Sequence, residues 1–216
     1  MERNKKILIL LLILLVISCN NLEKERIFKK HYFERVFQHD SLFSHFPEEI
    51  CNNHISYFYA TPCNDYDCIR GSAYLLCKTP KPAKYRAIYD YMQVCMYNPA
   101  NCFTIEELFA DDPVGRYPYA NRYVPGQLPV PRMESFDFGL GYREHEDPNY
   151  PELPVRTYNL PEDLEVHVIE ADSGYFWKEK VEVFRPQELG PWKHGYSRGV
   201  ALSEKEQMVG YWVMVW

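Results

Sequence analysis

The last nine residues of the chain, Met208–Trp216 (MVGYWVMVW), decide the fold of its C-terminal part. Apolar side chains occupy both alternating faces of this segment: Tyr211, Val213 and Val215 on one, and Trp212, Met214 and Trp216 on the other. A strand with two apolar faces is typical of a sheet that is covered on both sides. The polar residues Ser203–Gln207 predict a turn before it, and Gly199–Leu202 predicts the partner strand of a hairpin.

Two further strands are predicted upstream of this hairpin. Leu164–Ala171 and Tyr175–Phe184 both alternate between apolar and polar residues. Asp172-Ser173-Gly174 between them has the composition of a turn. We therefore expect residues 162–216 to form an antiparallel sheet.

Helices are expected in the first half of the chain. Apolar side chains recur at helical spacing in Leu22–Phe37 and in Pro82–Tyr97, and Thr104–Glu107 fits a capping box at the start of a third, brief helix. Two short segments, His54–Ala60 and Ser72–Cys77, predict strands. The predicted fold class is α+β, with N-terminal helices and short strands held by disulfides and a C-terminal antiparallel sheet.

The middle of the chain, residues 113–161, is rich in tyrosine and holds nine of the 16 prolines. A flexible linker would be polar, so we expect this aromatic segment to be irregular but packed on the domain. The predicted organisation is a single domain over residues 27–216. It consists of a Cys-rich helical part (27–112), this irregular segment, and the sheet (162–216).

The N-terminus has the pattern of a secretory signal. Met1–Lys6 is basic, and Ile7–Ile17 is a run of 11 apolar residues, whereas a membrane-spanning helix needs about 20. The run ends at Val16-Ile17-Ser18-Cys19, which resembles the lipobox of bacterial lipoproteins. That resemblance implies cleavage of a signal peptide (1–18), diacylglycerol on the Cys19 thiol, and acylation of the new amine by a fatty acid such as palmitate. An ordinary signal peptide with a chance Cys, or an uncleaved anchor, is the alternative.

Residues 19–26 follow as a polar tether, so we expect the protein in the cell envelope, held on a membrane by its N-terminal lipid. Asn20 stands where the inner-membrane retention rule of enteric bacteria would want Asp, which favours the outer membrane in a Gram-negative host. Cleavage leaves 198 residues and changes the net charge from −6 to −8, because three basic residues and one acidic residue leave with the signal. An acidic chain is a poor nucleic-acid ligand and is better suited to a basic partner.

Six cysteines remain when Cys19 is set aside for lipid. They fall within one stretch of 52 residues: Cys51, Cys63, Cys68, Cys77, Cys95 and Cys102. In an oxidising compartment this even number predicts three disulfides, and six cysteines allow 15 pairings between which the sequence does not choose. A metal site with His54 is the alternative, but the spacings do not match a zinc finger. We predict no metal and no cofactor.

Three short motifs could carry chemistry. Gly195-Tyr196-Ser197-Arg198-Gly199 matches the G-x-S-x-G pattern of α/β-hydrolases, but no His and no Asp follows Ser197, so we predict that it is not a nucleophile. His145–Asp147 and Asn64–Asp67 offer metal ligands without the spacing of a known metal motif. We expect a solvated loop at the first and a disulfide-closed turn at the second.

Without a recognisable catalytic constellation, a binding role is expected. The predicted function is a lipid-anchored cell-envelope protein that binds another protein without catalysis, for example an immunity-type inhibitor with an acidic surface against a basic toxin. An envelope enzyme that acts on cell-wall material is one alternative, and a structural or assembly lipoprotein is the other. The expected partners are the membrane, through the lipid, and a protein.

Overall fold

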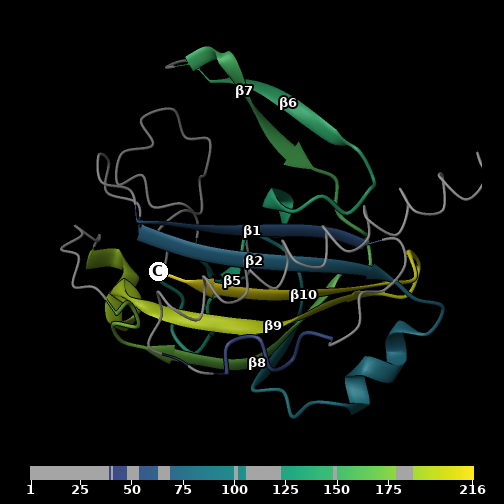
Figure 1. Cartoon of the computed structure of the whole chain (residues 1–216), viewed down its shortest axis with the longest axis horizontal. Coiled ribbons are helices and arrows are strands. Elements are labelled where there is room, and N and C mark those ends of the chain that lie inside the picture. Colours follow the sequence, from purple (N-terminus) through teal and green to yellow (C-terminus); the bar gives the residue numbers. More distant parts are fainter. Residues whose placement is uncertain are drawn as a thin grey trace, which may run out of the picture.

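The computed structural model describes residues 39, 41–47, 54–62, 69–99, 102–105, 123–147, 150–178 and 187–216. The predicted signal peptide, the predicted tether and the predicted helix Leu22–Phe37 lie outside these residues. The described part of the chain is built on one main antiparallel sheet (Figure 1).

The main sheet has six strands in the order β1-β2-β10-β9-β8-β3, and every neighbouring pair is antiparallel. Its strands are β1 (His54–Pro62), β2 (Ile69–Lys78), β3 (Gln93–Met96), β8 (Glu165–Ser173), β9 (Gly195–Ser203) and β10 (Met208–Val215). All of β10 is buried, between β2 and β9. The strand predicted from Met208–Trp216 and the burial of both its faces are therefore confirmed.

Short elements surround this sheet. A parallel pair joins β4 (Thr104–Ile105) to β5 (Val130–Pro131), and β6 (Tyr142–Asp147) forms a hairpin with β7 (Tyr150–Tyr158). Figure 1 shows this hairpin extending away from the main sheet. The helical elements of the described residues are three 3₁₀ segments: η1 (Pro82–Ala87), η2 (Met133–Ser135) and η3 (Gln187–Lys193).

The predicted α+β class is wrong, because the described residues contain strands and 3₁₀ turns but no α-helix. The predicted helix Pro82–Tyr97 divides into η1 and the strand β3. Its residues 91–97 satisfy two periods at once: Met92 and Met96 are four apart, yet the burial alternates residue by residue as in a strand. Pairing with β8, a tertiary contact, selects the strand.

Two other local predictions are corrected by the structure. Thr104, expected to cap a helix, is buried in β4 and pairs with Val130. The segment expected to be irregular contains β5, η2 and the hairpin β6–β7. Residues 175–178 of the predicted strand Tyr175–Phe184 form only a single bridge, at Trp177, and residues 179–186 lie outside the description.

Apolar layers cover both faces of the main sheet, because successive side chains of a strand point to opposite sides. On one face, residues such as Tyr74, Val168 and Trp212 pack against Met133 and Phe138. The opposite face is covered by two segments, 41–47 and 85–91, which lie over side chains of β2, β8, β9 and β10. The candidate site lies on this second face.

Candidate functional site

Ser197 is a buried structural residue. It lies in β9 with no exposed surface, and its hydroxyl donates a hydrogen bond to the carbonyl oxygen of Pro129 over 2.6 Å. A Cβ at Gly199 would lie 2.0 Å from the carbonyl oxygen of His167 and 2.7 Å from the Trp212 ring, so only glycine allows this close approach of β8 and β10. Sheet packing therefore accounts for the G-x-S-x-G pattern.

The structure places three of the seven cysteines. Cys77 in β2 is disulfide-bonded, to a partner outside the described residues. Cys95 and Cys102 carry free thiols whose sulfur atoms are 3.6 Å apart. Cys19 and the remaining candidates, Cys51, Cys63 and Cys68, lie outside the described residues. The three disulfides therefore stay a prediction.

The two motifs weighed as metal sites do not form a cluster in the described part of the chain. His145 is exposed in β6, where it pairs with Val155 of β7. Asn64–Asp67 lies outside the description. Among the described residues, no group of three or more His, Cys, Asp or Glu side chains could hold a metal ion.

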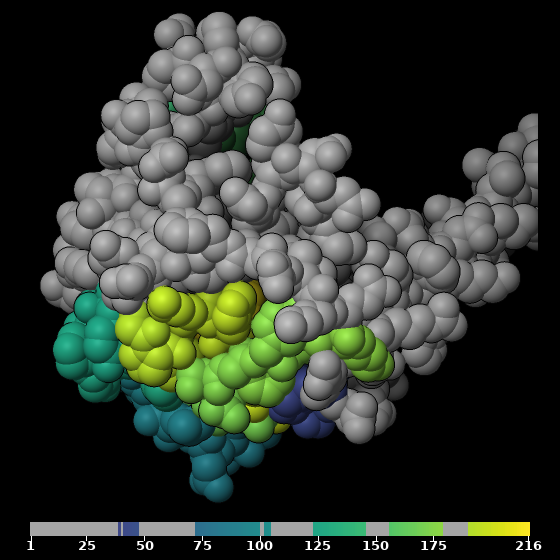
Figure 2. Space-filling model, turned by 90° about the vertical axis from the view of Figure 1, so that its left-hand side faces the viewer, coloured from purple at the N-terminus to yellow at the C-terminus, as the bar shows by residue number. Residues whose placement is uncertain are grey.

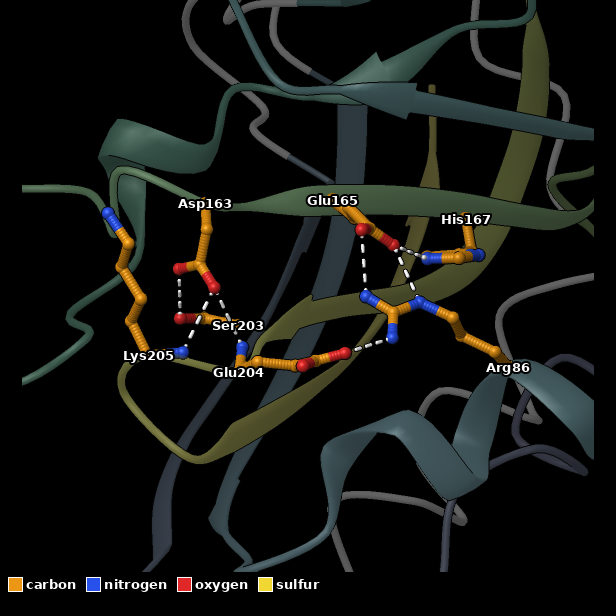
Figure 3. A network of polar contacts seen from close by, with 7 residues as sticks. All are labelled: Arg86, Asp163, Glu165, His167, Ser203, Glu204 and Lys205. Carbon is orange, nitrogen blue, oxygen red and sulfur yellow. Dashed lines mark hydrogen bonds and ion pairs between the residues drawn. The ribbon is translucent and has the colours of Figure 1, made fainter.

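A polar cluster at one end of the second sheet face joins η1 and β8 to the turn between β9 and β10 (Figure 3). The Arg86 guanidinium of the η1 segment donates from Nε to Glu165 Oε2 over 2.9 Å and from Nη2 to Glu165 Oε1 over 2.7 Å. Its Nη1 also donates to Glu204, in the turn between β9 and β10. His167, two residues beyond Glu165 on β8, holds the same carboxylate over 3.0 Å. Arg86 therefore fastens η1 to the sheet.

Burial and charge fix the protonation of this cluster. The hydrogen bonds from Arg86 hold the pKa of Glu165 below its usual value, so it is a carboxylate at neutral pH. Burial lowers the pKa of His167 although Glu165 opposes the shift, so the ring is neutral, and Nε2–H is then the donor to Glu165. No partner among the described residues reaches His167 Nδ1. The centroids of the Tyr91 and His167 rings are 4.5 Å apart, and His167 is only 2% exposed, so a substrate could not contact it directly.

Asp163 orders the turn that presents Glu204 to Arg86 (Figure 3). Its Oδ2 accepts hydrogen bonds from the backbone amides of Glu204 over 2.9 Å and Lys205 over 3.0 Å, and its Oδ1 accepts one from the Ser203 hydroxyl. Burial acts to raise the pKa of Asp163, but these hydrogen bonds outweigh it, and the pKa lies below its usual value.

Arg198 fastens the other covering segment in the same manner. Its guanidinium pairs with Glu170 of β8 over 2.6 Å and donates to the Ser44 hydroxyl over 2.7 Å and to the backbone carbonyl of Ser41. Beside it, His45 Nε2 lies 3.0 Å from the Trp212 carbonyl oxygen. Burial, and then the charge of Arg198, lower the pKa of His45 to about 3. Both charged clusters of this face thus hold covering segments on the sheet.

The exposed feature beside the Arg86 cluster is an apolar strip on β3 and on the segment that leads into it. Four large side chains stand more than half exposed: Ile88 (57%), Met92 (59%), Val94 (52%) and Met96 (55%). β3 is the last strand of the sheet, and β8 is its only pairing partner in the described chain. Val94 pairs with His167 and Met96 with Glu165, which places the strip directly beside the cluster.

Figure 2 shows the blue part of the chain that contains these residues projecting at the lower edge of the molecule. This strip was not predicted from the sequence, because the helix expected over Pro82–Tyr97 placed Ile88, Met92 and Met96 on one helical face. In the sequence, the available signal was that Met92, Val94 and Met96 recur at every second position, which is the period of a strand.

The comparisons with known proteins found no matching family model, no similar curated protein and no similar solved structure. Within the described residues, no helix has the length and apolar character required to cross a membrane. The function is therefore inferred from the geometry of the described residues.

Proposed function

We propose that this chain is a lipid-anchored cell-envelope protein that binds a basic partner protein, without catalysis, through the edge of β3. The proposed occupant is an extended segment of that partner, which adds to β3 as a further strand. One observation carries the proposal: four large apolar side chains are exposed along the last strand of the sheet and the segment leading into it.

An exposed strand edge is a template for another strand, and soluble proteins usually protect it with charged residues or proline. β3 has neither, since it reads Gln93-Val94-Cys95-Met96. Main-chain hydrogen bonds along such an edge supply affinity, and side chains of alternate residues supply specificity. Complete burial of each Val or Met side chain contributes about 1.5–3 kcal/mol. The strip therefore favours a partner strand with apolar side chains at alternate positions.

Charge favours a basic partner. The whole chain has a net charge of −6. Next to the strip, Arg86 is held by two carboxylates, Glu165 and Glu204, so this cluster has one negative charge in excess when His167 is neutral. Exposed Asp90 lies on the segment between η1 and β3. Exposed Lys81 and Lys84 at η1 offset part of this local charge, so the attraction of a basic partner comes from the net charge of the whole chain, which raises the rate of encounter more than the final affinity.

The test uses the full-length tagged protein in detergent-solubilised envelope. Val94→Lys and Met96→Lys place a charge in the strip, and Tyr142→Lys is the matched control, because Tyr142 is 47% exposed on the separate hairpin β6–β7. We expect Val94→Lys and Met96→Lys to lower partner capture at least tenfold and Tyr142→Lys to leave it unchanged. Equal capture by all three variants would contradict the proposal.

A photo-reactive amino acid at Val94 identifies the occupant. We expect it to cross-link to an extended segment of a basic protein, and the corresponding synthetic peptide should bind the wild type but not Val94→Lys. Cross-linking to a second copy of this chain, or to lipid alone, would replace the proposed occupant by a dimer or a membrane surface.

A further inference from the structure

We propose that Cys95 and Cys102 are joined by a disulfide in the mature protein, a covalent modification that closes residues 95–102 into a loop at the edge of the sheet. Their sulfur atoms are already 3.6 Å apart, in van der Waals contact. A disulfide needs about 2.05 Å, so a small side-chain movement brings them to bonding distance.

The backbone holds the two cysteines together without the bond. Cys95 lies in β3, with its side chain packed against the core, and Cys102 comes directly before the buried residues Phe103 and Thr104. The Cys102 amide donates to the carbonyl oxygen of Asn98 over 2.8 Å, which turns the chain back toward β3. Main-chain geometry therefore already holds the two cysteines close together, so little further conformational freedom is lost when the bond forms.

The environment of the pair favours thiol chemistry. Hydrogen bonds from the Cys95 thiol and from the Asn98 amide, the latter 3.5 Å from the sulfur, lower the pKa of Cys102 to about 7 against the opposing effect of burial. The thiolate is the form that attacks a disulfide. The pair can therefore lose its first proton near neutral pH, while the partly exposed Cys95 gives access from outside.

The oxidant is a protein disulfide of the envelope, by thiol–disulfide exchange. One thiolate of the pair attacks that disulfide, forms a mixed disulfide and releases one thiolate of the oxidant. The second sulfur of the pair, deprotonated, then attacks the first and releases the other thiolate of the oxidant. Two electrons and two protons leave Cys95 and Cys102, and the oxidant is recovered as a dithiol.

This inference rests on the proposed function in one respect: an envelope oxidant can reach the chain only if the chain is exported. The disulfide of Cys77 is an independent sign that the chain is built for an oxidising compartment. With Cys95 and Cys102 paired, four cysteines remain, and they allow three pairings. The proposed bond therefore reduces the number of possible disulfide pairings of the six cysteines from 15 to three.

Peptide mapping tests the pairing directly. Trypsin cuts after Arg86 and next after Arg116, so Cys95 and Cys102 fall in one peptide, residues 87–116, whereas Cys77 falls in residues 71–78. The wild-type protein is purified from the envelope without reductant, treated with iodoacetamide and digested. We expect peptide 87–116 to carry no alkyl group and to be two hydrogens lighter than its dithiol form. Two alkylated thiols, or a cross-link to another peptide, would overturn the pairing.

A second arm separates this inference from the proposed function. The full chain is reduced and then reoxidised in a glutathione buffer, which supplies oxidant whether or not the protein is exported in the cell. Formation of the internal bond in peptide 87–116 supports the pairing even if lipidation and export fail. Free thiols after reoxidation overturn it even if Cys19 is lipidated. In the Cys102→Ser variant, we expect Cys95 to be fully alkylated, while Cys77 in peptide 71–78 remains disulfide-bonded and is not alkylated.

Discussion

Arg86 and Glu165 are 79 residues apart in the sequence and form a two-point ion pair in the fold, with both carboxylate oxygens accepting from the guanidinium. The pair joins η1 to β8, and β8 is the strand on which β3 is paired. The same carboxylate also holds His167, whose ring lies under Tyr91. Loss of this one pair should therefore loosen the segment that leads into the exposed strip.

Substitution of Arg86 by Ala should destabilise the protein by about 1–2 kcal/mol, because a bidentate, partly buried pair is lost and Glu165 is left with fewer donors. Urea unfolding followed by tryptophan fluorescence measures the change. Arg156→Ala is the matched control, since its pair with Glu144 has side chains 52% and 45% exposed. The control should leave the free energy of unfolding nearly unchanged, because solvent screens an exposed ion pair. Equal effects of the two substitutions would contradict a special role of Arg86.

Acid should destabilise the fold from about pH 6.5 downwards, and His45 should contribute to this loss. Its pKa is about 3 in the folded chain against an ordinary 6.5, so the unfolded chain binds a proton first. The stability due to neutral His45 is present above pH 6.5 and is lost as the pH falls toward 3, by at most about 1.4 kcal/mol per unit.

Urea unfolding at a series of pH values measures this loss. His45→Gln should have a lower free energy of unfolding at pH 7 but a flatter dependence between pH 6.5 and 3. His145→Gln, at an exposed position of β6, should keep the slope of the wild type. An unchanged slope in His45→Gln would show that His45 is not the titrating group.

Gly199→Ala should unfold the protein or destabilise it by about 3 kcal/mol or more, because its Cβ would overlap the backbone carbonyl of His167. Ser197→Ala, in the same strand, removes one buried hydrogen bond and should cost only about 1–2 kcal/mol. Thermal unfolding of the two variants makes the comparison.

We also expect fluorophosphonate probes to leave the wild type unlabelled, because Ser197 is buried. Labelling of the wild type that is lost in Ser197→Ala would restore the hydrolase alternative.

Cys19→Ala should abolish labelling by a palmitate analogue and release the chain from the membrane fraction, because the lipobox thiol is the proposed site of the lipid. Metabolic labelling followed by fractionation measures both effects. Cys102→Ser is the control and should remain labelled and membrane-bound. Persistent labelling of Cys19→Ala would show that another residue carries the lipid.

Much of the main sheet could be predicted from local sequence. The strands near His54, Ser72, Leu164 and Met208 were placed correctly, because alternation or a short run of apolar and aromatic residues marks a strand wherever it lies in the fold. The helix predicted over Pro82–Tyr97 failed because its spacing fits two periods, and contact with β8 decides between them.

Local sequence is sufficient to place most strands of the main sheet and to define an acidic, Cys-rich composition, and it predicts an export signal with a lipobox. Only the tertiary structure decided that Arg86 meets Glu165, that Arg198 meets Ser44 across 154 residues, and that Cys95 lies against Cys102. The fold also places β3 at one end of the main sheet, with the side chains of Val94 and Met96 exposed. The physical reason is that strand order and the docking of covering segments depend on contacts between distant residues, whereas alternation, turn composition and signal patterns are properties of neighbouring residues.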